Sequence, residues 1–256
     1  MHPARTDPAR DAAARIRHEL QLGTGRVDVF GVLKSLGIEV YMAPFPYGAD
    51  ALEGAHMVKD GQAFVFVNNE RAITRQRFTA AHELGHHVLD NPPDGSAIFE
   101  SGATDQDDAI EQSAYRFARF FLMDPEGVGH LVAGIKDYRQ MVAAVAATFV
   151  VSPEVGAIHL QELGLISARE KLELTAEINS KATTPSTLLK RYGYRMAYTD
   201  PGPVPELDEG FVGRTIEAYA REWISLAAFA ESLQLPDAQS REFITELELP
   251  IREPEA

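Results

Sequence analysis

Residues 71–89 read RAITRQRFTAAHELGHHVL and contain the motif HExxH at positions 82–86. The run has no proline, and its apolar residues recur near the helical period, which predicts a helix. These apolar residues are Ile73, Phe78, Ala81, Leu84 and Val88. Gly85 lies in the middle of this predicted helix, where glycine costs roughly 1 kcal/mol relative to alanine. We therefore expect a steric reason for Gly85, such as the close approach of another chain or of a substrate backbone.

His82 and His86 are spaced for binding one metal ion. Residues four apart in a helix lie on nearly the same face, one turn apart, so the two imidazoles can bind one zinc ion. Glu83 projects about 100° round the helix axis from His82, where a general base could deprotonate an attacking water. An accidental HExxH in a chain of this composition is an event on the order of 2%. The motif therefore predicts a zinc-dependent hydrolytic site with Glu83 as its catalytic base.

A catalytic zinc ion needs a third protein ligand and an open fourth position. Residues 108–123, DAIEQSAYRFARFFLM, form a second predicted helix, and Glu111 lies at one end of its otherwise apolar face. A carboxylate that points into a core is costly unless a charged partner or a metal compensates it. Alternatively, Glu111 is a first-turn residue favoured by the helix dipole, but Asp107 and Asp108 fit that role better. We therefore predict a His2Glu site for one zinc ion per chain.

Two separated motifs carry a resemblance to a known family. HELGHH at 82–87, followed by E-x-x-A-x-x-F-A-x-x-F-L-M at 111–123, resembles the ImmA/IrrE family of zinc metallopeptidases. The resemblance extends over roughly residues 10–165. It implies that His82, His86 and Glu111 hold zinc and that Glu83 is the catalytic base. Members typically cleave a helix-turn-helix repressor at one site, so a repressor or antitoxin-like regulator is the expected substrate, with a role in transcription regulation or stress response.

The sequence departs from the family pattern at two points. Tyr115 stands where the family usually has asparagine, which could alter substrate fit, and Asp124 separates Met123 from Pro125. Peptide hydrolysis also needs a donor for the oxyanion of the intermediate. His87, Tyr115 and His56 are candidates that the sequence does not rank. His87 points about 100° away from its ligand neighbour, which favours a surface or supporting role for it.

The composition excludes several classes of protein and site. The chain has 256 residues, no cysteine and a net charge of −14, so disulfides and cysteine-ligated zinc sites are excluded. The first 20 residues lack the apolar core of a secretory signal, and no apolar run reaches the roughly 18 residues of a membrane span. We therefore expect a cytoplasmic protein without a membrane segment. The negative charge makes direct DNA binding an unfavoured alternative, and the oligomeric state is left open.

The predicted fold class is α+β, mainly helical, with a small N-terminal antiparallel or mixed sheet packed on a zincin-like HExxH helix. Helices are expected at 8–22 and 27–36, a strand at 38–42, and a hairpin at 56–59 and 63–68 around Asp60-Gly61. Residues 91–106 are expected to form a loop that could border the active site. The strand at 64–67 is either a core strand or an edge strand with which an extended substrate could pair.

The C-terminal half is expected to be helical. A helix-turn-helix-like pattern spans two predicted helices at 138–149 and 154–163, with Ser152 as the cap of the second. The second helix lacks Lys and Arg, which favours a role in structural packing over DNA binding. Prolines 201, 203 and 205 predict a linker. Residues 204–256 hold 12 acidic and 4 basic side chains. We therefore predict a zinc metallopeptidase domain at 1–135, a helix-turn-helix-like region at 136–200 and an acidic helical appendage at 201–256.

Two alternative functions remain for comparison. One is a DNA-binding regulatory protein with a vestigial zinc site, based on the pattern at 138–164. The other is a partner-binding module with a structural zinc site, which would need a fourth protein ligand such as His87 or Asp107. Neither alternative needs a carboxylate base at Glu83.

Overall fold

The computed structural model describes residues 7–43, 53–90, 97–101, 109–195, 209–233, 237–247 and 249–251. The chain divides into two compact units, Met1–Pro203 and Val204–Ala256. The fold class is α+β, as predicted from the sequence. Residues 136–195 lie in the same compact unit as the residues before them. The linker predicted at 201–205 and the alternative ligand Asp107 lie outside the described residues.

The first unit contains four strands and nine helices among its described residues. The strands are β1 (Glu39–Ala43), β2 (Gly54–Lys59), β3 (Gln62–Asn68) and β4 (Ala97–Ser101). The helices are α1 (Pro8–Glu19), α2 (Val29–Ser35), α3 (Ile73–Leu89), α4 (Ala109–Leu122), α5 (Pro125–Val132), α6 (Tyr138–Phe149), α7 (Pro153–Glu162), α8 (Ala168–Asn179) and α9 (Pro185–Arg191).

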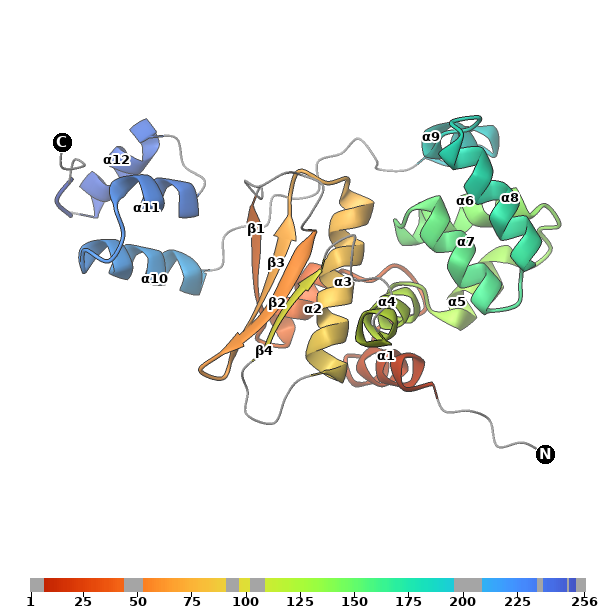
Figure 1. Cartoon of the computed structure of the whole chain (residues 1–256), viewed down its shortest axis with the longest axis horizontal. Coiled ribbons are helices and arrows are strands. Elements are labelled where there is room, and N and C mark those ends of the chain that lie inside the picture. The colour runs from red at the N-terminus through yellow and green to blue at the C-terminus, as the bar shows by residue number, and fades with distance from the viewer. Residues whose placement is uncertain are drawn as a thin grey trace. The chain divides into compact units, whose positions relative to one another are not determined.

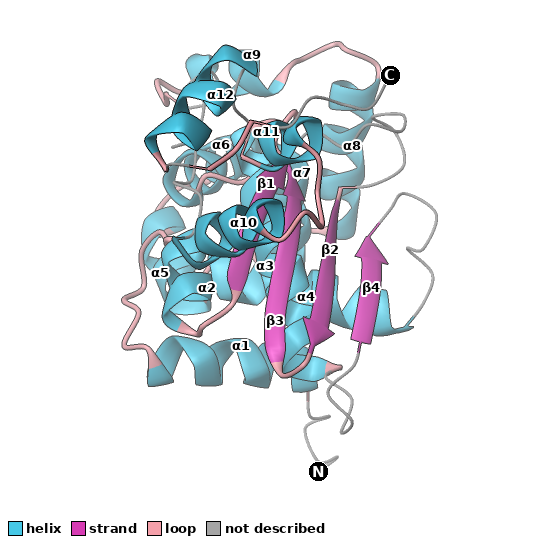
Figure 2. Cartoon of the chain, turned by 90° about the vertical axis from the view of Figure 1, so that its left-hand side faces the viewer, coloured by secondary structure: helices cyan, strands magenta, loops and turns pink. Residues whose placement is uncertain are grey.

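The strands form one mixed sheet in the order β1-β3-β2-β4, seen face-on in Figure 2. β1 runs parallel to β3, and the other neighbours are antiparallel. Asp60 and Gly61 both have positive φ angles, of 52° and 78°, so the Asp-Gly turn of the hairpin is confirmed. β3 lies inside the sheet, which excludes it as an edge for substrate pairing. The loop prediction for 91–106 was wrong at 97–101, because β4 pairs there with β2.

The HExxH helix α3 lies between the sheet and a pair of helices, α4 and α1 (Figure 1). Its sheet side contacts β2 and β3, whose residues alternate between buried and partly exposed positions. Val65 and Val67 of β3 are fully buried, as are Ala81 and Leu84 of α3. α1 begins at Pro8, with the Asp7 carboxylate accepting a hydrogen bond from the backbone of Arg10. The sheet and α4 therefore hold α3 from opposite sides.

Helices α6 and α7 have the helix-turn-helix look that the sequence predicted. Ser152 caps α7 by accepting a hydrogen bond from the backbone N–H of Val155, and Pro153 is its first residue. No residue from 151 to 163 is exposed, so α7 presents no open face that could enter a DNA groove. No single helix among the described residues is long and apolar enough to span a membrane. Only α6 and α7 taken together reach that length and composition, and they are bent by 112° at their junction.

The second unit contains α10 (Glu209–Ala220), α11 (Leu226–Ser232) and α12 (Asp237–Glu246). Its core is a separate apolar cluster of Tyr219, Leu226, Phe229, Leu233 and Ile244. The Tyr219 hydroxyl donates a hydrogen bond to the backbone carbonyl of Pro250, which ties the chain after α12 to α10. This unit therefore has a core of its own.

Candidate metal centre

Three buried side chains from two helices meet at one point. The Nε2 atoms of His82 and His86, both on α3, are 3.0 Å apart. The Glu111 carboxylate of α4 lies 3.1 Å from Nε2 of His82 and 2.9 Å from Nε2 of His86. The exposed fractions of the three residues are only 1%, 0% and 7%. The sequence prediction that Glu111 joins the two histidines in space is therefore met by the geometry.

Gly85 explains how α4 can come so close to α3. A Cβ atom at this position would lie 3.1 Å from both the Cα and the carbonyl oxygen of Ala114, and 3.2 Å from Cδ1 of Phe117. Ala114 is one turn after Glu111, so the contact lies beside the ligands. Gly85 thus has a steric reason, as expected, but the neighbour is a helix of the same chain and not another chain or a substrate backbone, and its approach brings Glu111 to the histidines.

The charges at this point favour a cation. Burial alone would raise the pKa of Glu111, but hydrogen bonds with His82 and His86 outweigh it and hold the pKa at about 2. Burial lowers the pKa of His82. Burial also acts to lower the pKa of His86, but the hydrogen bond and charge of Glu111 and the charge of Glu83 outweigh it and raise that pKa. A carboxylate and two imidazole rings thus converge on one point, and each can act as a Lewis base when it is deprotonated.

Nitrogen and oxygen ligands in this number match a catalytic zinc site with an open position. Among the described residues, His82, His86 and Glu111 form the group whose ligand atoms lie within 4.8 Å of one another. His87, an alternative fourth ligand, instead contacts His56. The donor set thus fits zinc, with His82, His86 and Glu111 as the residues that could hold it.

Asp90 is a functional candidate that the sequence reasoning missed. Its Oδ2 atom lies 3.2 Å from Nδ1 of His86, the ring nitrogen that faces away from the cluster. Carboxylates in this position fix the orientation and tautomer of a metal-binding histidine. The signal was present, because Asp90 follows His86 by four residues, one turn along the same helix.

Glu83 lies at the sheet side of α3, beside the first residue of β2. Its side chain is fully buried. A Cβ atom on Gly54 would lie 2.9 Å from Oε1 of Glu83 and 2.8 Å from the carbonyl oxygen of Phe66, and it would also overlap Thr79. Only glycine fits at the start of β2 because the Glu83 carboxylate and the backbone of β3 fill the space. The sequence did not indicate this contact, which depends on how the hairpin packs on α3.

The three candidate oxyanion donors lie in two places. Tyr115, one turn after Glu111, packs on His82 with a ring-centroid distance of 4.3 Å. His56 of β2 and His87 of α3 contact each other instead, with 3.1 Å between Nε2 and Nδ1. Burial, followed by the charges of His87 and His86, lowers the pKa of His56 to about 3. The structure therefore places Tyr115 on a ligand ring and pairs His56 with His87.

Comparison with protein-family models gives one finding for this chain. Residues 33–161, half of the chain, match the model of peptidase M78, described as the IrrE N-terminal-like domain. The matched range contains β1, the hairpin, α3 and α4, and therefore every residue of the candidate metal centre. No curated protein matches the sequence.

Proposed function

The chain belongs to the IrrE N-terminal-like peptidase family, and we propose that it is a zinc-dependent endopeptidase that cleaves a protein substrate at one site. The observation that carries the proposal is the buried convergence of His82, His86 and Glu111. Glu83 follows His82 directly in the motif, with its carboxylate on the sheet side of α3. A structural site would need no carboxylate base there.

In this mechanism His82, His86 and Glu111 would hold the metal, and Asp90 would orient His86. Zinc, when bound, supplies a Lewis acid that polarises the scissile carbonyl and brings the pKa of water towards about 7. Glu83 accepts the proton of the attacking water and then delivers it to the leaving amine. A Cβ atom at Gly54 would come within 2.9 Å of Oε1 of Glu83, so glycine at this position leaves the space that the Glu83 carboxylate occupies.

We propose a helix-turn-helix repressor or antitoxin-like regulator as the substrate, and its cleavage would relieve repression. The proposal is supported by the family membership and is compatible with the net charge of −14, which suits a basic protein partner. The alternative of a DNA-reading protein is not favoured, because α7 has no exposed residue and its charged side chains are acidic, Glu154 and Glu162.

The first experiment compares wild type with Glu83→Gln. Both proteins are loaded with zinc, their metal content is measured, and each is incubated with the helix-turn-helix regulator encoded beside this gene. We expect one zinc ion per chain in both, and a single cut by wild type only, because the amide of glutamine is no base.

The matched control is Glu70→Gln, which changes an exposed carboxylate before α3 and should cut normally. His82→Ala should lose both zinc and cleavage. Cleavage by Glu83→Gln at the normal rate would contradict the role of Glu83, and a zinc-free wild type under metal-replete conditions would contradict the metal site.

A further inference from the structure

Tyr115 is held beside the metal centre by two aromatic contacts. Its ring packs on His82 at 4.3 Å between centroids and stacks on Phe78 at 6.1 Å with an interplanar angle of 15°. Phe78 and His82 are one turn apart on α3, and Tyr115 follows Glu111 by one turn on α4. The tyrosine is thus fixed between a metal-ligand ring and a second aromatic ring, while its side chain stays only partly buried.

The hydroxyl of Tyr115 makes no hydrogen bond within the part of the chain that the structure describes. Four of the other described tyrosines use their hydroxyls: Tyr41 donates to Glu39, Tyr138 to Glu173, Tyr192 to Asp137 and Tyr219 to the carbonyl of Pro250. A phenol has an ordinary pKa of about 10 and keeps its proton at neutral pH. Tyr115 therefore offers a donor that no acceptor among the described residues uses.

The other candidate donors are already engaged with each other. His56 Nε2 and His87 Nδ1 are 3.1 Å apart, which occupies one ring nitrogen on each residue. His56, on the hairpin strand β2, is also fully buried. These two ring nitrogens therefore face each other, whereas Tyr115 packs on the ring of His82, a residue of the candidate metal centre.

We propose that the Tyr115 hydroxyl donates a hydrogen bond to the oxygen of the scissile carbonyl as that oxygen becomes an oxyanion. The role rests on the proposed function. When the water oxygen bonds to the carbonyl carbon, the electron pair of the C=O bond moves onto the oxygen, where the phenol stabilises the charge without transferring its proton. When the C–N bond breaks, the pair returns and the amine leaves with the proton that Glu83 delivers. A rigid donor of this kind typically contributes about 10²-fold or more to kcat.

Tyr115→Phe tests this role, because it keeps the ring that packs on His82 and Phe78 and removes only the hydroxyl. On the regulator substrate we expect kcat to fall about 100-fold, with KM within about twofold and one zinc ion per chain. Tyr192→Phe, which removes a tyrosine hydroxyl that contacts Asp137 in the helical region, is the matched control and should match wild type.

A binding measurement tests the same role without turnover. An N-phosphoryl dipeptide mimics the tetrahedral oxyanion, and zinc-loaded Tyr115→Phe should bind it about 100-fold more weakly than wild type. Equal kcat and equal binding in the two proteins would overturn the role of Tyr115. Loss of zinc from Tyr115→Phe would likewise overturn it in favour of a packing role. A zinc-loaded wild type that neither cuts the regulator nor binds the mimic would overturn the proposed function itself.

Discussion

At the scale of single residues, Gly85 controls the distance between the helices that carry the metal ligands. Alanine at this position would gain roughly 1 kcal/mol of helix propensity. Its Cβ, however, would meet backbone atoms of Ala114 at 3.1 Å, and backbone cannot move aside like a flexible side chain. We expect Gly85→Ala to destabilise the protein by about 1–3 kcal/mol and to weaken zinc binding about 10-fold, measured by denaturant unfolding and by competition with a chelating dye.

Gly129→Ala is the matched control for this change. Gly129 also lies inside a helix, α5, but a Cβ there would have nothing within 4 Å. The unfolding free energy of this variant should rise by up to about 1 kcal/mol, and it should bind zinc like wild type. If Gly85→Ala were as stable as Gly129→Ala and kept its zinc affinity, α4 would not depend on the glycine for its approach.

Whether the contacts of a residue could be predicted from the sequence depends on how far apart in the chain the contacting residues are. His82 and His86 could be placed together from spacing alone, because the geometry of one helix decides it. Glu111 could be predicted because a carboxylate on an apolar face needs a compensating charge. The contact of Gly54 with Glu83 could not, since it requires knowing how β2 lies against α3. The catalytic role of Glu83 stays a prediction.

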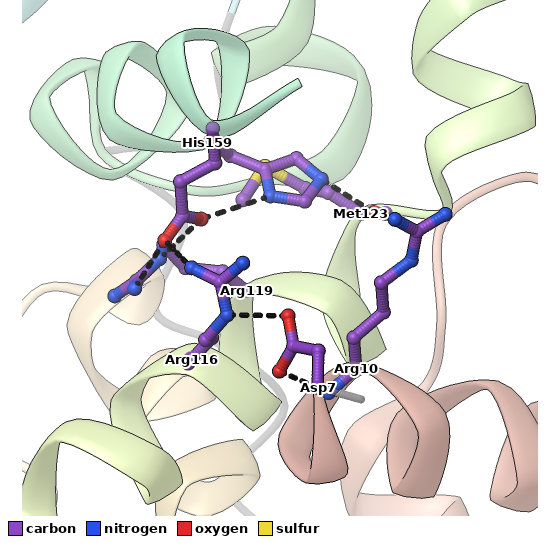
Figure 3. A network of polar contacts seen from close by, with 7 residues as sticks. Asp7, Arg10, Arg116, Arg119, Met123 and His159 are labelled. Carbon is purple, nitrogen blue, oxygen red and sulfur yellow. Dashed lines mark hydrogen bonds and ion pairs between the residues drawn. The ribbon is translucent and has the colours of Figure 1, made fainter. Parts of the chain in front are cut away.

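At the scale of elements, a polar network fastens α7 to the ligand helix α4 (Figure 3). Glu162 of α7 accepts hydrogen bonds from Arg116 at 2.7 Å and from Arg119 at 2.7 and 2.9 Å. His159 Nε2 lies 2.9 Å from the carbonyl oxygen of Met123, just after α4. Arg116 also donates to Asp7 at the start of α1. The helix-turn-helix-like region thus packs against the helix that carries Glu111.

Glu162→Gln tests how much this network contributes to the stability of the protein. Burial acts to raise the pKa of Glu162, but hydrogen bonds with His159 and Arg119 and the charges of both arginines outweigh it and hold the pKa at about 2. The glutamate of the unfolded chain has a pKa of about 4.3. The carboxylate therefore stabilises the fold above about pH 4.5, and this contribution is lost as the pH falls towards 2. At pH 7 we expect Glu162→Gln to lose about 3 kcal/mol of unfolding free energy.

The pH series identifies the carboxylate as the source of that loss. In urea unfolding, the difference in unfolding free energy between wild type and Glu162→Gln should stay constant from pH 7 to about 5 and decrease below about pH 5. Glu19→Gln is the control, because Glu19 forms an exposed ion pair with Arg15 one turn earlier on α1; it should change stability by less than about 0.5 kcal/mol. A small difference in unfolding free energy at pH 7 would mean that the packing of α7 does not depend on the network.

Element prediction succeeded where the signal was local and failed where pairing was long-range. The Asp-Gly hairpin, the capped start of α7 and the bounds of α6 follow from turn residues, caps and period. β4 was missed because residues 97–101 lie among prolines, glycines and short polar residues, and their strand exists through pairing with β2. The packing of α7 was favoured from its lack of Lys and Arg, but its neighbours α4, α6 and α8 could not be predicted, because these contacts are long-range.

At the scale of the whole molecule, the two units have separate cores. The metal ligands all belong to Met1–Pro203, whose core includes the sheet, α3 and α4. The core of Val204–Ala256 rests on Tyr219, Phe229 and a few aliphatic residues of three short helices. Metal binding should therefore stabilise the first unit without acting on the second.

Calorimetry with and without chelator tests this separation. A ligand at 1,000 times its Kd stabilises by about 4 kcal/mol, which corresponds to about 10 °C for a unit of roughly 200 residues. We expect chelation to lower the Tm of the first unit by about this amount and to leave a separate transition of the second unit in place. In His82→Ala, which lacks a ligand, chelator should shift neither transition. Equal shifts of both transitions in wild type would mean that the units unfold as one cooperative body, and no shift in either would mean that the His2Glu cluster does not hold the metal in the native state.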